Sequence, residues 1–248
     1  MSELNVFRYD DSGLNDAVAI VGFPTVGLVG SIIGSYIVRE LKMPVLRGMY
    51  SDNMSPYSIL INGDPYPPIR VHGFCRDEKE GRCNDLMVIT SEIAPDARQC
   101  CILAREILDM CKEYGVKTVV CLEGIPRYSS DDVSFAAGNS PRAREMIKGF
   151  GLEPLENGMI KGLTGVMLFE GKERNIDVVT ILSPAEAQLP DPRSAAEVLK
   201  KLTDVIPELK DIDLTPLVQE AEELEKRIRS QTEIGEAKPP EDDNHLYG

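Results

Sequence analysis

Ala17-Val-Ala-Ile-Val-Gly22 is a short apolar run that ends in glycine, and Phe23-Pro-Thr-Val-Gly27 follows it directly. A short apolar run bounded by Gly and Pro is typical of a buried β-strand. We therefore expect a strand at 17–22, a tight turn at 22–27 and a helix at 27–41. A buried strand that leads through a glycine-rich turn into a helix indicates an α/β protein.

The rest of the chain continues this alternation. Strands are predicted at 44–50, 56–61, 69–74, 85–92, 117–122, 133–137 and 176–182, and helices at 95–115, 140–149, 163–175 and 193–206. Pro95 is expected in the first turn of its helix, and residues 123–132 are expected to form a loop. Because several strands are apolar throughout, the sheet is predicted to be mostly parallel, with helices on both faces.

The last forty residues differ from this core, which we assign to residues 1–210. Thr215-Pro216 predicts the start of a helix at 216–231, within a C-terminal helical region at 211–232. A short apolar seam on this helix is expected to pack on the domain or on a second copy, and it consists of Leu217, Ala221, Leu224 and Ile228. Residues 233–248 are rich in Glu, Asp, Pro and Gly, which predicts a flexible acidic tail.

The charge of the chain excludes some classes of partner. The 248 residues carry a net charge of −14, and the segment from Glu208 to Gly248 has twelve acidic and five basic residues. An acidic chain repels phosphate backbones, so nucleic-acid binding is not expected. No apolar stretch is long enough to span a membrane, and Met1-Ser-Glu-Leu-Asn does not resemble a secretory signal. The expected location is the cytoplasm.

The cysteines and histidines give no metal-binding pattern. Six cysteines lie at positions 75, 83, 100, 101, 111 and 121, and none forms a C-x₂-C pair. The two histidines are His72 and His245, which is too few for a His-rich metal site. We therefore expect reduced thiols, no metal site and no cofactor.

The glycine-rich turn could suggest a phosphate-binding loop. Gly22 and Gly27 have the spacing of a Walker loop, but Leu28 and Val29 stand where that loop needs Lys and Ser or Thr. Neither side chain can contact phosphate or Mg²⁺. The glycines at 27, 30 and 34 are better explained by close packing of the helix, within the fold or between subunits.

Two glutamates follow predicted parallel strands, where ligand sites of such folds lie. Glu92 and Glu123 could form a carboxylate pair for acid–base chemistry. They could instead cap helices or pair with Arg98 and Arg127. The candidate pocket at this edge consists of Gly22, Phe23, Pro24, Thr25, Glu92 and Glu123. The sequence offers no nucleophile elbow and no Cys–His pair, so no catalytic residue is assigned.

The tail ends in Leu246-Tyr247-Gly248, a hydrophobic residue, a tyrosine and a free carboxyl group. A flexible linker of about a dozen residues gives these side chains a reach on the order of 20 Å. Leu offers an apolar anchor, Tyr a ring and a hydroxyl, and the carboxylate a partner for a lysine. The tail therefore suits docking in a pocket of another protein, although a disordered end without a role remains the alternative.

Four segments, in this order, resemble landmarks of the proteasome assembly chaperone 2 family in its archaeal-type form. They are Gly22-Phe-Pro-Thr-Val-Gly-Leu-Val-Gly-Ser31, Ser91-Glu-Ile93, Leu122-Glu-Gly-Ile-Pro126 and Leu189-Pro-Asp-Pro-Arg193. The resemblance covers about residues 14–230. Glu123 is a departure, because the family usually has a small residue there, and it could alter a pocket.

The resemblance implies a fold like that of phosphorylases and hydrolases, without their catalytic residues, and self-association as trimers or tetramers. The Leu246–Gly248 tail is similar to the hydrophobic–Tyr–X tails of proteasome activators and archaeal assembly chaperones, which insert between α subunits. The leading hypothesis is thus a non-enzymatic protein that docks on the proteasome α ring and assists assembly or gate opening. The alternatives are a small-ligand or nucleotide-binding enzyme and an oligomeric scaffold.

Overall fold

A computed structural model describes residues 4–10, 13–14, 16–74, 85–129 and 131–223. The strands are β1 (Leu4–Arg8), β2 (Val18–Gly22), β3 (Val45–Ser51), β4 (Ile59–Ile61), β5 (Asp64–Tyr66), β6 (Ile69–Phe74), β7 (Leu86–Ser91), β8 (Thr118–Pro126), β9 (Phe135–Gly138), β10 (Glu153–Pro154) and β11 (Asp177–Ala185). The α-helices are α1 (Val29–Glu40), α2 (Ala97–Glu113), α3 (Pro141–Gly149), α4 (Gly162–Glu173) and α5 (Pro192–Val205), and short 3₁₀ turns are η1 (Val26–Leu28) and η3 (Pro207–Leu209).

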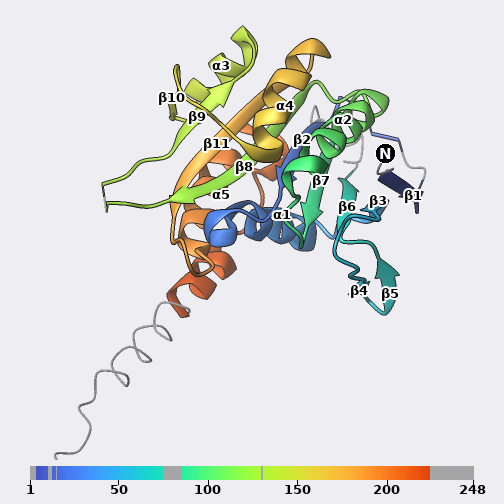
Figure 1. Cartoon of the computed structure of the whole chain (residues 1–248). Helices are drawn as coiled ribbons and strands as arrows, with labels where there is room; N and C mark the ends of the chain where they lie inside the picture. Colours follow the sequence, from blue (N-terminus) through green and yellow to red (C-terminus); the bar gives the residue numbers. More distant parts are fainter. Residues whose placement is uncertain (1–3, 11–12, 15, 75–84, 130, 224–248) are drawn as a thin grey trace, which may run out of the picture.

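Nine strands form one sheet, in the order β1-β3-β6-β7-β2-β8-β11-β9-β10. The four central strands, β7, β2, β8 and β11, run parallel to one another. Antiparallel pairing joins β6, β3 and β1 on one side and β9 on the other. The predicted α/β fold with a mostly parallel core is therefore confirmed, and β4 and β5 form a separate hairpin that projects from the sheet (Figure 1).

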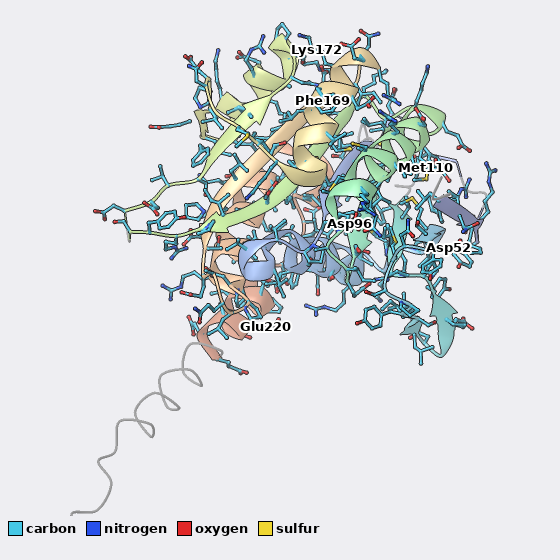
Figure 2. The ribbon with its side chains drawn as sticks, viewed as in Figure 1. Asp52, Asp96, Met110, Phe169, Lys172 and Glu220 are labelled. Carbon is cyan, nitrogen blue, oxygen red and sulfur yellow. The ribbon has the colours of Figure 1, made fainter. Side chains whose placement is uncertain are left out.

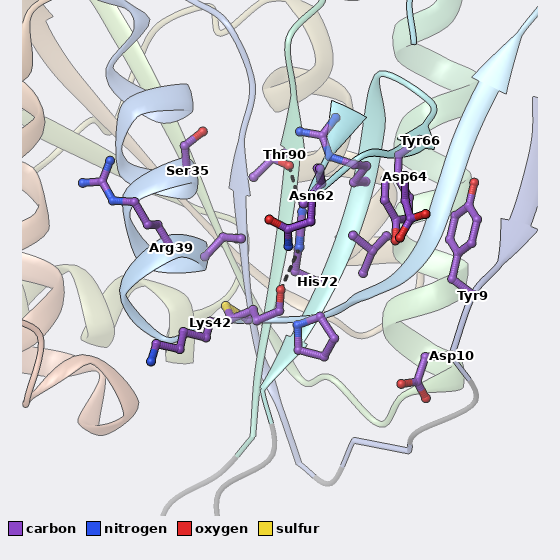
Figure 3. Close-up of a pocket in the computed structure, with 16 residues that line it drawn as sticks. Tyr9, Asp10, Ser35, Arg39, Lys42, Asn62, Asp64, Tyr66, His72 and Thr90 are labelled. Carbon is purple, nitrogen blue, oxygen red and sulfur yellow. Dashed lines mark hydrogen bonds between the residues drawn. The ribbon is translucent and has the colours of Figure 1, made fainter. Parts of the chain in front are cut away.

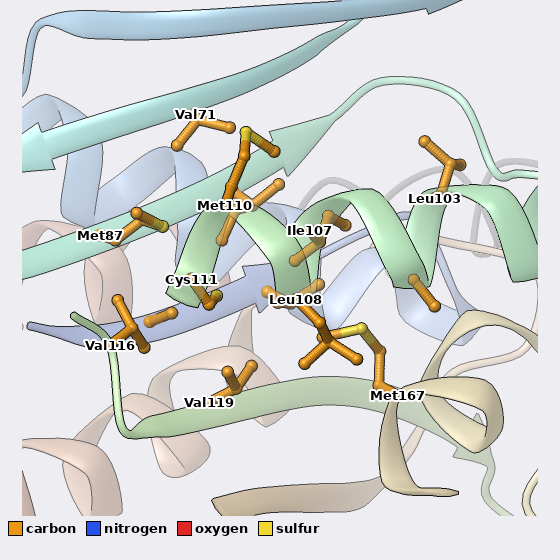
Figure 4. Packing of buried hydrophobic residues seen from close by; sticks show 14 of the residues in the cluster. Val71, Met87, Leu103, Ile107, Leu108, Met110, Cys111, Val116, Val119 and Met167 are labelled. Carbon is orange, nitrogen blue, oxygen red and sulfur yellow. The ribbon is translucent and has the colours of Figure 1, made fainter. Parts of the chain in front are cut away.

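Helices cover both faces of this sheet, as the apolar strands predicted (Figure 1). Along β2, Ala19 and Val21 pack with α2 and α4, while Ile20 packs with α1, α3 and α5 on the opposite face. Figure 4 shows Leu103, Ile107 and Leu108 of α2 in the first of these two clusters. Two fully buried faces explain why the central strands are apolar at nearly every position.

Strand β8 is longer than predicted. The segment from Glu123 to Pro126 was expected in a loop, but it remains paired with Leu182–Ala185 of β11. Strands β2 and β7 end earlier, at Gly22 and Ser91. Thus β8 and β11 extend past their neighbours and form a wall at the carboxyl edge of the sheet.

Two predicted helix starts need correction. Pro95 lies before α2, whose N-cap is Asp96, because Asp96 and Gln99 form a reciprocal capping box with N–H to side-chain distances of 2.9 Å. Figure 2 labels Asp96 at this end of the helix. The C-terminal helix begins at residue 215, slightly before the predicted residue 216, and Asp213 accepts the N–H of Thr215 at 2.9 Å.

The apolar seam of the C-terminal helix packs on the domain in the part described, residues 215–223. Leu217 and Ala221 are buried, and Leu217 belongs to the cluster around α1 and α5. The hydroxyl of Tyr36 on α1 also donates a hydrogen bond to the carbonyl of Asp213. Leu224, Ile228 and the predicted tail at 233–248 lie outside the described residues, and the division at residues 210 and 232 stays a prediction.

The glycines of the opening segment place α1 against the sheet backbone. A Cβ atom on Gly22 would lie 2.3 Å from the carbonyl oxygen of Gly30, and one on Gly30 would lie 2.6 Å from that of Leu122. No side chain fits at either distance. The sequence suggested close helix packing for Gly27, Gly30 and Gly34, and for Gly30 this packing occurs within the fold.

We therefore expect Gly30→Ala to lower the free energy of unfolding by about 3 kcal/mol, the upper end for overpacking, because a backbone oxygen cannot move aside as a side chain can. Urea unfolding of the purified protein measures this change. Gly149→Ala in α3 is the matched control, since its Cβ would meet its nearest neighbour at 3.6 Å. A loss for Gly149→Ala equal to that for Gly30→Ala would contradict the explanation.

Candidate functional site

A pocket of about 410 Å³ lies at the carboxyl edge of the central strands. Four segments build it, and its lining includes Phe23, Pro24 and Thr25 after β2, Ala94, Pro95, Ala97 and Cys100 around the start of α2, Leu122 and Glu123 of β8, and Lys161–Thr164 at the start of α4. We call it the strand-end pocket. Of the six candidate residues, Phe23, Pro24, Thr25 and Glu123 line it, whereas Gly22 lies beneath α1 and Glu92 points elsewhere.

The extension of β8 holds the loop that forms one side of this pocket. The N–H of Gly124 donates a hydrogen bond to the Thr25 hydroxyl oxygen at 2.9 Å. A Cβ on Gly124 would lie 1.8 Å from the carbonyl oxygen of Val26, so the loop rests directly on the strand backbone. Thr25 and the loop from Phe23 to Val26 are thereby fixed against β8.

Glu123 is the acidic group of the strand-end pocket. Burial raises the pKa of its carboxyl group, while a hydrogen bond from the Thr164 side chain and the nearby charge of Lys161 lower it. The Oε2 atom is buried and has no hydrogen-bond partner among the described residues. The predicted pairing with Arg127 does not occur, because that guanidinium lies 3.6 Å from Asp191 instead.

Glu92 does not form a carboxylate pair with Glu123. Its carboxylate binds the Arg70 guanidinium through two hydrogen bonds, one of which measures 2.7 Å from the Nη1 nitrogen to Oε2. Arg70 is buried, with 6% of its side chain exposed, and it also donates to the carbonyls of Pro67 and Pro68. Glu92 therefore neutralises a buried cation, and the alternative pairing with Arg98 does not occur.

A second and larger pocket, of about 670 Å³, lies near the antiparallel side of the sheet (Figure 3). Arg39 and Lys42 at the end of α1 form one side of it, and Asn62 and Asp64 of the β4–β5 hairpin approach from another (Figure 3). Tyr9, Tyr66, Arg70, His72 and Thr90 also line it. We call it the edge pocket.

His72 is held as a neutral imidazole at the back of the edge pocket. Its Nε2 atom lies 3.3 Å from the Thr90 hydroxyl, and its Nδ1 atom lies 3.4 Å from the Met43 carbonyl oxygen. Burial and the nearby charge of Arg70 together lower the pKa of His72 to about 4, although the hydrogen bond with the Met43 carbonyl opposes this shift. The prediction of His72 as a strand residue agrees with its place on β6.

The sequence did not reveal the edge pocket, because its sides come from α1, the hairpin and β6, whose neighbourhood is set by the fold. One signal was present. Arg70 and His72 alternate along a strand, so two polar side chains share a face that should be apolar if it were fully packed. From that pattern alone, a pocket could have been predicted on this face of the sheet.

The cysteines of the described residues are free thiols, and the same residues hold no cluster of metal ligands. Cys100, Cys101, Cys111 and Cys121 are free, and burial raises the pKa of Cys111 to about 12. No group of three or more His, Cys, Asp or Glu side chains in the described ranges could hold a metal ion. The helices of these ranges include none that is long and apolar enough to cross a membrane.

Comparisons with known proteins identify the relatives of this chain. The model of the PAC2 family matches residues 19–232. The chain belongs to the PAC2 family. This confirms the resemblance drawn from the four motifs, and the match spans every element that lines the strand-end pocket.

Relatives of this PAC2 protein match it over most of their length. An uncharacterized protein of Methanocaldococcus jannaschii, MJ0106, is 27% identical over 87% of this chain and 85% of its own length. The crystal structure of Pyrococcus furiosus PbaA, described as an archaeal homologue of proteasome-assembly chaperone, has a TM-score of 0.79 and 26% identity over 94% of this chain and 93% of its own. Pyrococcus furiosus PbaB, described as an archaeal proteasome activator, has a TM-score of 0.78 and 22% identity over 94% and 100% of the two chains, and shares the fold.

The candidate docking residues of this PAC2 chain, Leu246, Tyr247 and Gly248, lie outside the described residues. Their role therefore remains a prediction from the sequence. The two pockets belong to the folded part of the chain and can be tested apart from the tail.

Glu92→Gln tests the role of the buried ion pair. The substitution removes the negative charge and leaves the buried Arg70 guanidinium with carbonyl partners only. We therefore expect the free energy of unfolding to fall by roughly 2–3 kcal/mol. A fully buried ion pair would lose more, but Glu92 is partly exposed. Urea unfolding measures the loss. Glu145→Gln is the matched control, since it breaks an exposed pair with Lys148 and should cost less than about 0.5 kcal/mol. Equal losses would show that Arg70 does not need its partner.

His72 should make the protein less stable in acid. Its pKa is lower in the folded state, about 4, than the ordinary histidine value of 6.5, so the unfolded chain binds more protons between these values. Stability should fall as the pH drops from about 6.5 toward 4, by about 2 kcal/mol between pH 7 and pH 5. Urea unfolding at both pH values should give a smaller loss for His72→Gln. An identical loss in the variant would assign the effect to other groups.

Proposed function

We propose that this protein is a proteasome-binding protein of the assembly-chaperone type, which docks on the proteasome α ring through Leu246, Tyr247 and Gly248. The observation that carries the proposal is the similarity to PbaA over nearly the whole of both chains, at 26% identity. That relative is described as a homologue of proteasome-assembly chaperone. The proposed role is binding, without a catalytic step.

The chemistry of the tail supports docking. Leu246 would fill an apolar cleft, and Tyr247 would add a ring and a hydroxyl group that can hydrogen-bond. The Gly248 carboxylate would pair with a lysine of the pocket, in a charge-assisted hydrogen bond. Aromatic anchors of this kind commonly contribute most of the binding energy of a small interface.

The charge and composition before these residues support the same proposal. Residues 233–244 include five acidic side chains and two prolines, a composition that does not form a packed core. Repulsion between the like charges would favour an extended segment, which is part of the proposal. The docking residues would then reach a partner at a distance from the folded domain.

Self-association as trimers or tetramers is part of the proposal. Several tails on one assembly would bind the same ring, so the second and later contacts would be intramolecular. A weak individual tail could therefore give firm attachment. The same docking step would serve ring assembly or gate opening, depending on whether the α subunits are free or already part of a proteasome.

Deletion of Leu246–Gly248 tests the proposal. We expect the truncated protein to lose at least about tenfold in affinity for α subunits, because the anchor and the carboxylate are removed together. Pull-down and surface plasmon resonance with α rings of the same organism measure the change. Size-exclusion chromatography with light scattering should give the same oligomer for both proteins, since the folded domain is intact.

Three variants separate the contributions of the tail. Tyr247→Ala removes the ring, and a two-residue extension after Gly248 moves the carboxylate, so both should weaken binding. Asn244→Ala, just before the motif, is the matched control and should bind like the parent. If the truncated protein and the parent bind α rings equally well, tail docking is wrong.

A further inference from the structure

The strand-end pocket lies where the order of the parallel strands reverses. From β2 the chain passes through α1 and the antiparallel strands to β7 on one side of β2, and then through α2 to β8 on the other side. Helices α1 and α2 cover opposite faces of the sheet. In open α/β sheets, small ligands bind in the crevice at the carboxyl ends of the strands at this kind of reversal.

Glu123 gives this pocket an unsatisfied hydrogen-bond acceptor. Thr164 bonds its carboxylate, but Oε2 is buried without a partner among the described residues. Glu123 lines the pocket, and the terminal torsion of a glutamate is broad, so a modest rotation can turn its carboxylate toward the cavity. A ligand that donates hydrogen bonds and carries positive charge would satisfy this carboxylate.

Lys161 supplies the opposite charge at the same pocket. It is exposed and makes no ion pair within 4.0 Å in the part of the chain that the structure describes, but its charge acts on Glu123. Glu123 and Lys161 thus line the same pocket and form no ion pair with each other. A molecule carrying both an ammonium and a carboxylate group could bridge them.

The remaining walls are mostly apolar. Phe23, Pro24, Leu122 and Leu163 line the pocket between the loop after β2 and the start of α4. The volume of about 410 Å³ holds a small molecule with a branched aliphatic side chain. Apolar walls with a few convergent polar groups are typical of small-molecule sites.

We propose that the strand-end pocket binds a free α-amino acid with an apolar side chain, whose ammonium group contacts Glu123 and whose carboxylate contacts Lys161. A nucleotide fits less well, since the Glu123 carboxylate would repel its phosphates and Lys161 is the single cation that lines the pocket within the described residues. The site is independent of the tail, so it goes beyond proteasome docking.

Three probes of nearly the same shape test the proposal. L-leucine carries both charged groups, isoamylamine lacks the carboxylate and 4-methylpentanoic acid lacks the ammonium group. Binding of each probe to the full chain is measured in two experiments at constant ionic strength. The first is the shift in melting temperature, and the second is isothermal titration calorimetry. We expect L-leucine to raise the melting temperature saturably and the other two to bind at least about tenfold more weakly, because each loses a charged hydrogen bond.

Two variants assign the groups. Glu123→Gln keeps the shape of the side chain and removes its charge, and Lys161→Gln removes an exposed charge that the fold does not need. Each should weaken L-leucine binding about tenfold or more. Lys172→Gln is the matched control, because Lys172 is also exposed on α4 but lies roughly 16 Å farther along the helix (Figure 2). It should leave binding unchanged.

The outcomes separate clearly. Saturable L-leucine binding that both pocket variants weaken supports the proposal. The proposal is overturned if no probe binds saturably, if isoamylamine binds as tightly as L-leucine, or if Lys161→Gln binds like the parent. The Lys161 side chain is exposed and makes no cap hydrogen bond to α4, so we expect Lys161→Gln to fold and to decide the test even if Glu123→Gln folds poorly. Failure here would not affect tail docking, which pull-down measures separately.

Discussion

The contact between α1 and the backbone of the central strands is the constraint on which the rest of this structure depends. Gly22, Gly30 and Gly124 allow it, because a Cβ atom on any of them would lie 2.6 Å or less from a carbonyl oxygen. The chain must therefore turn from β2 into α1 within a few residues. It does so with two successive left-handed residues, Gly27 at φ 63° and Leu28 at φ 53°. This turn leaves Phe23 to Thr25 on the side of the strand-end pocket.

Much of this architecture could be predicted from the sequence, because its signals are local. Strand β6 begins and ends at its predicted residues, and the apolar runs identified the central strands and the two covered faces. The end of β8 could not be predicted, since Gly124 and Pro126 are residues typical of turns. What keeps them in the strand is pairing with β11 and the close approach of Val26, and both depend on segments distant in the chain.

The candidate site shows the same division between local and distant information. The strand ends identified Phe23, Pro24, Thr25 and Glu123, because parallel strands end at a common edge. The partner of Glu92 was not predictable, since Arg70 reaches it across an antiparallel pair whose register no local pattern gives. Glu92 directly follows β7 and Glu123 lies within the extended β8, yet the first neutralises a buried guanidinium and the second keeps a free acceptor. The sequence can therefore indicate that a glutamate lies near the edge of the sheet. Its role depends on the side chains that surround it in the fold.

The strand-end pocket and the described part of the C-terminal helix, residues 215–223, lie on different faces of the sheet. The strand-end pocket opens between the starts of α2 and α4, whereas the C-terminal helix that leads to the tail packs with α1 and α5 on the other face. The loop after β2 connects them, because it lines the pocket and continues directly into α1. Helix α1 in turn holds the C-terminal helix through the Tyr36 hydrogen bond to Asp213. A ligand that changed the conformation of this loop would also act on α1, which follows it in the chain. The packing of α1 at Gly30 leaves no space for an added atom, so α1 cannot deform locally there. Any effect of the ligand on the C-terminal helix would therefore require α1 to shift as a rigid unit.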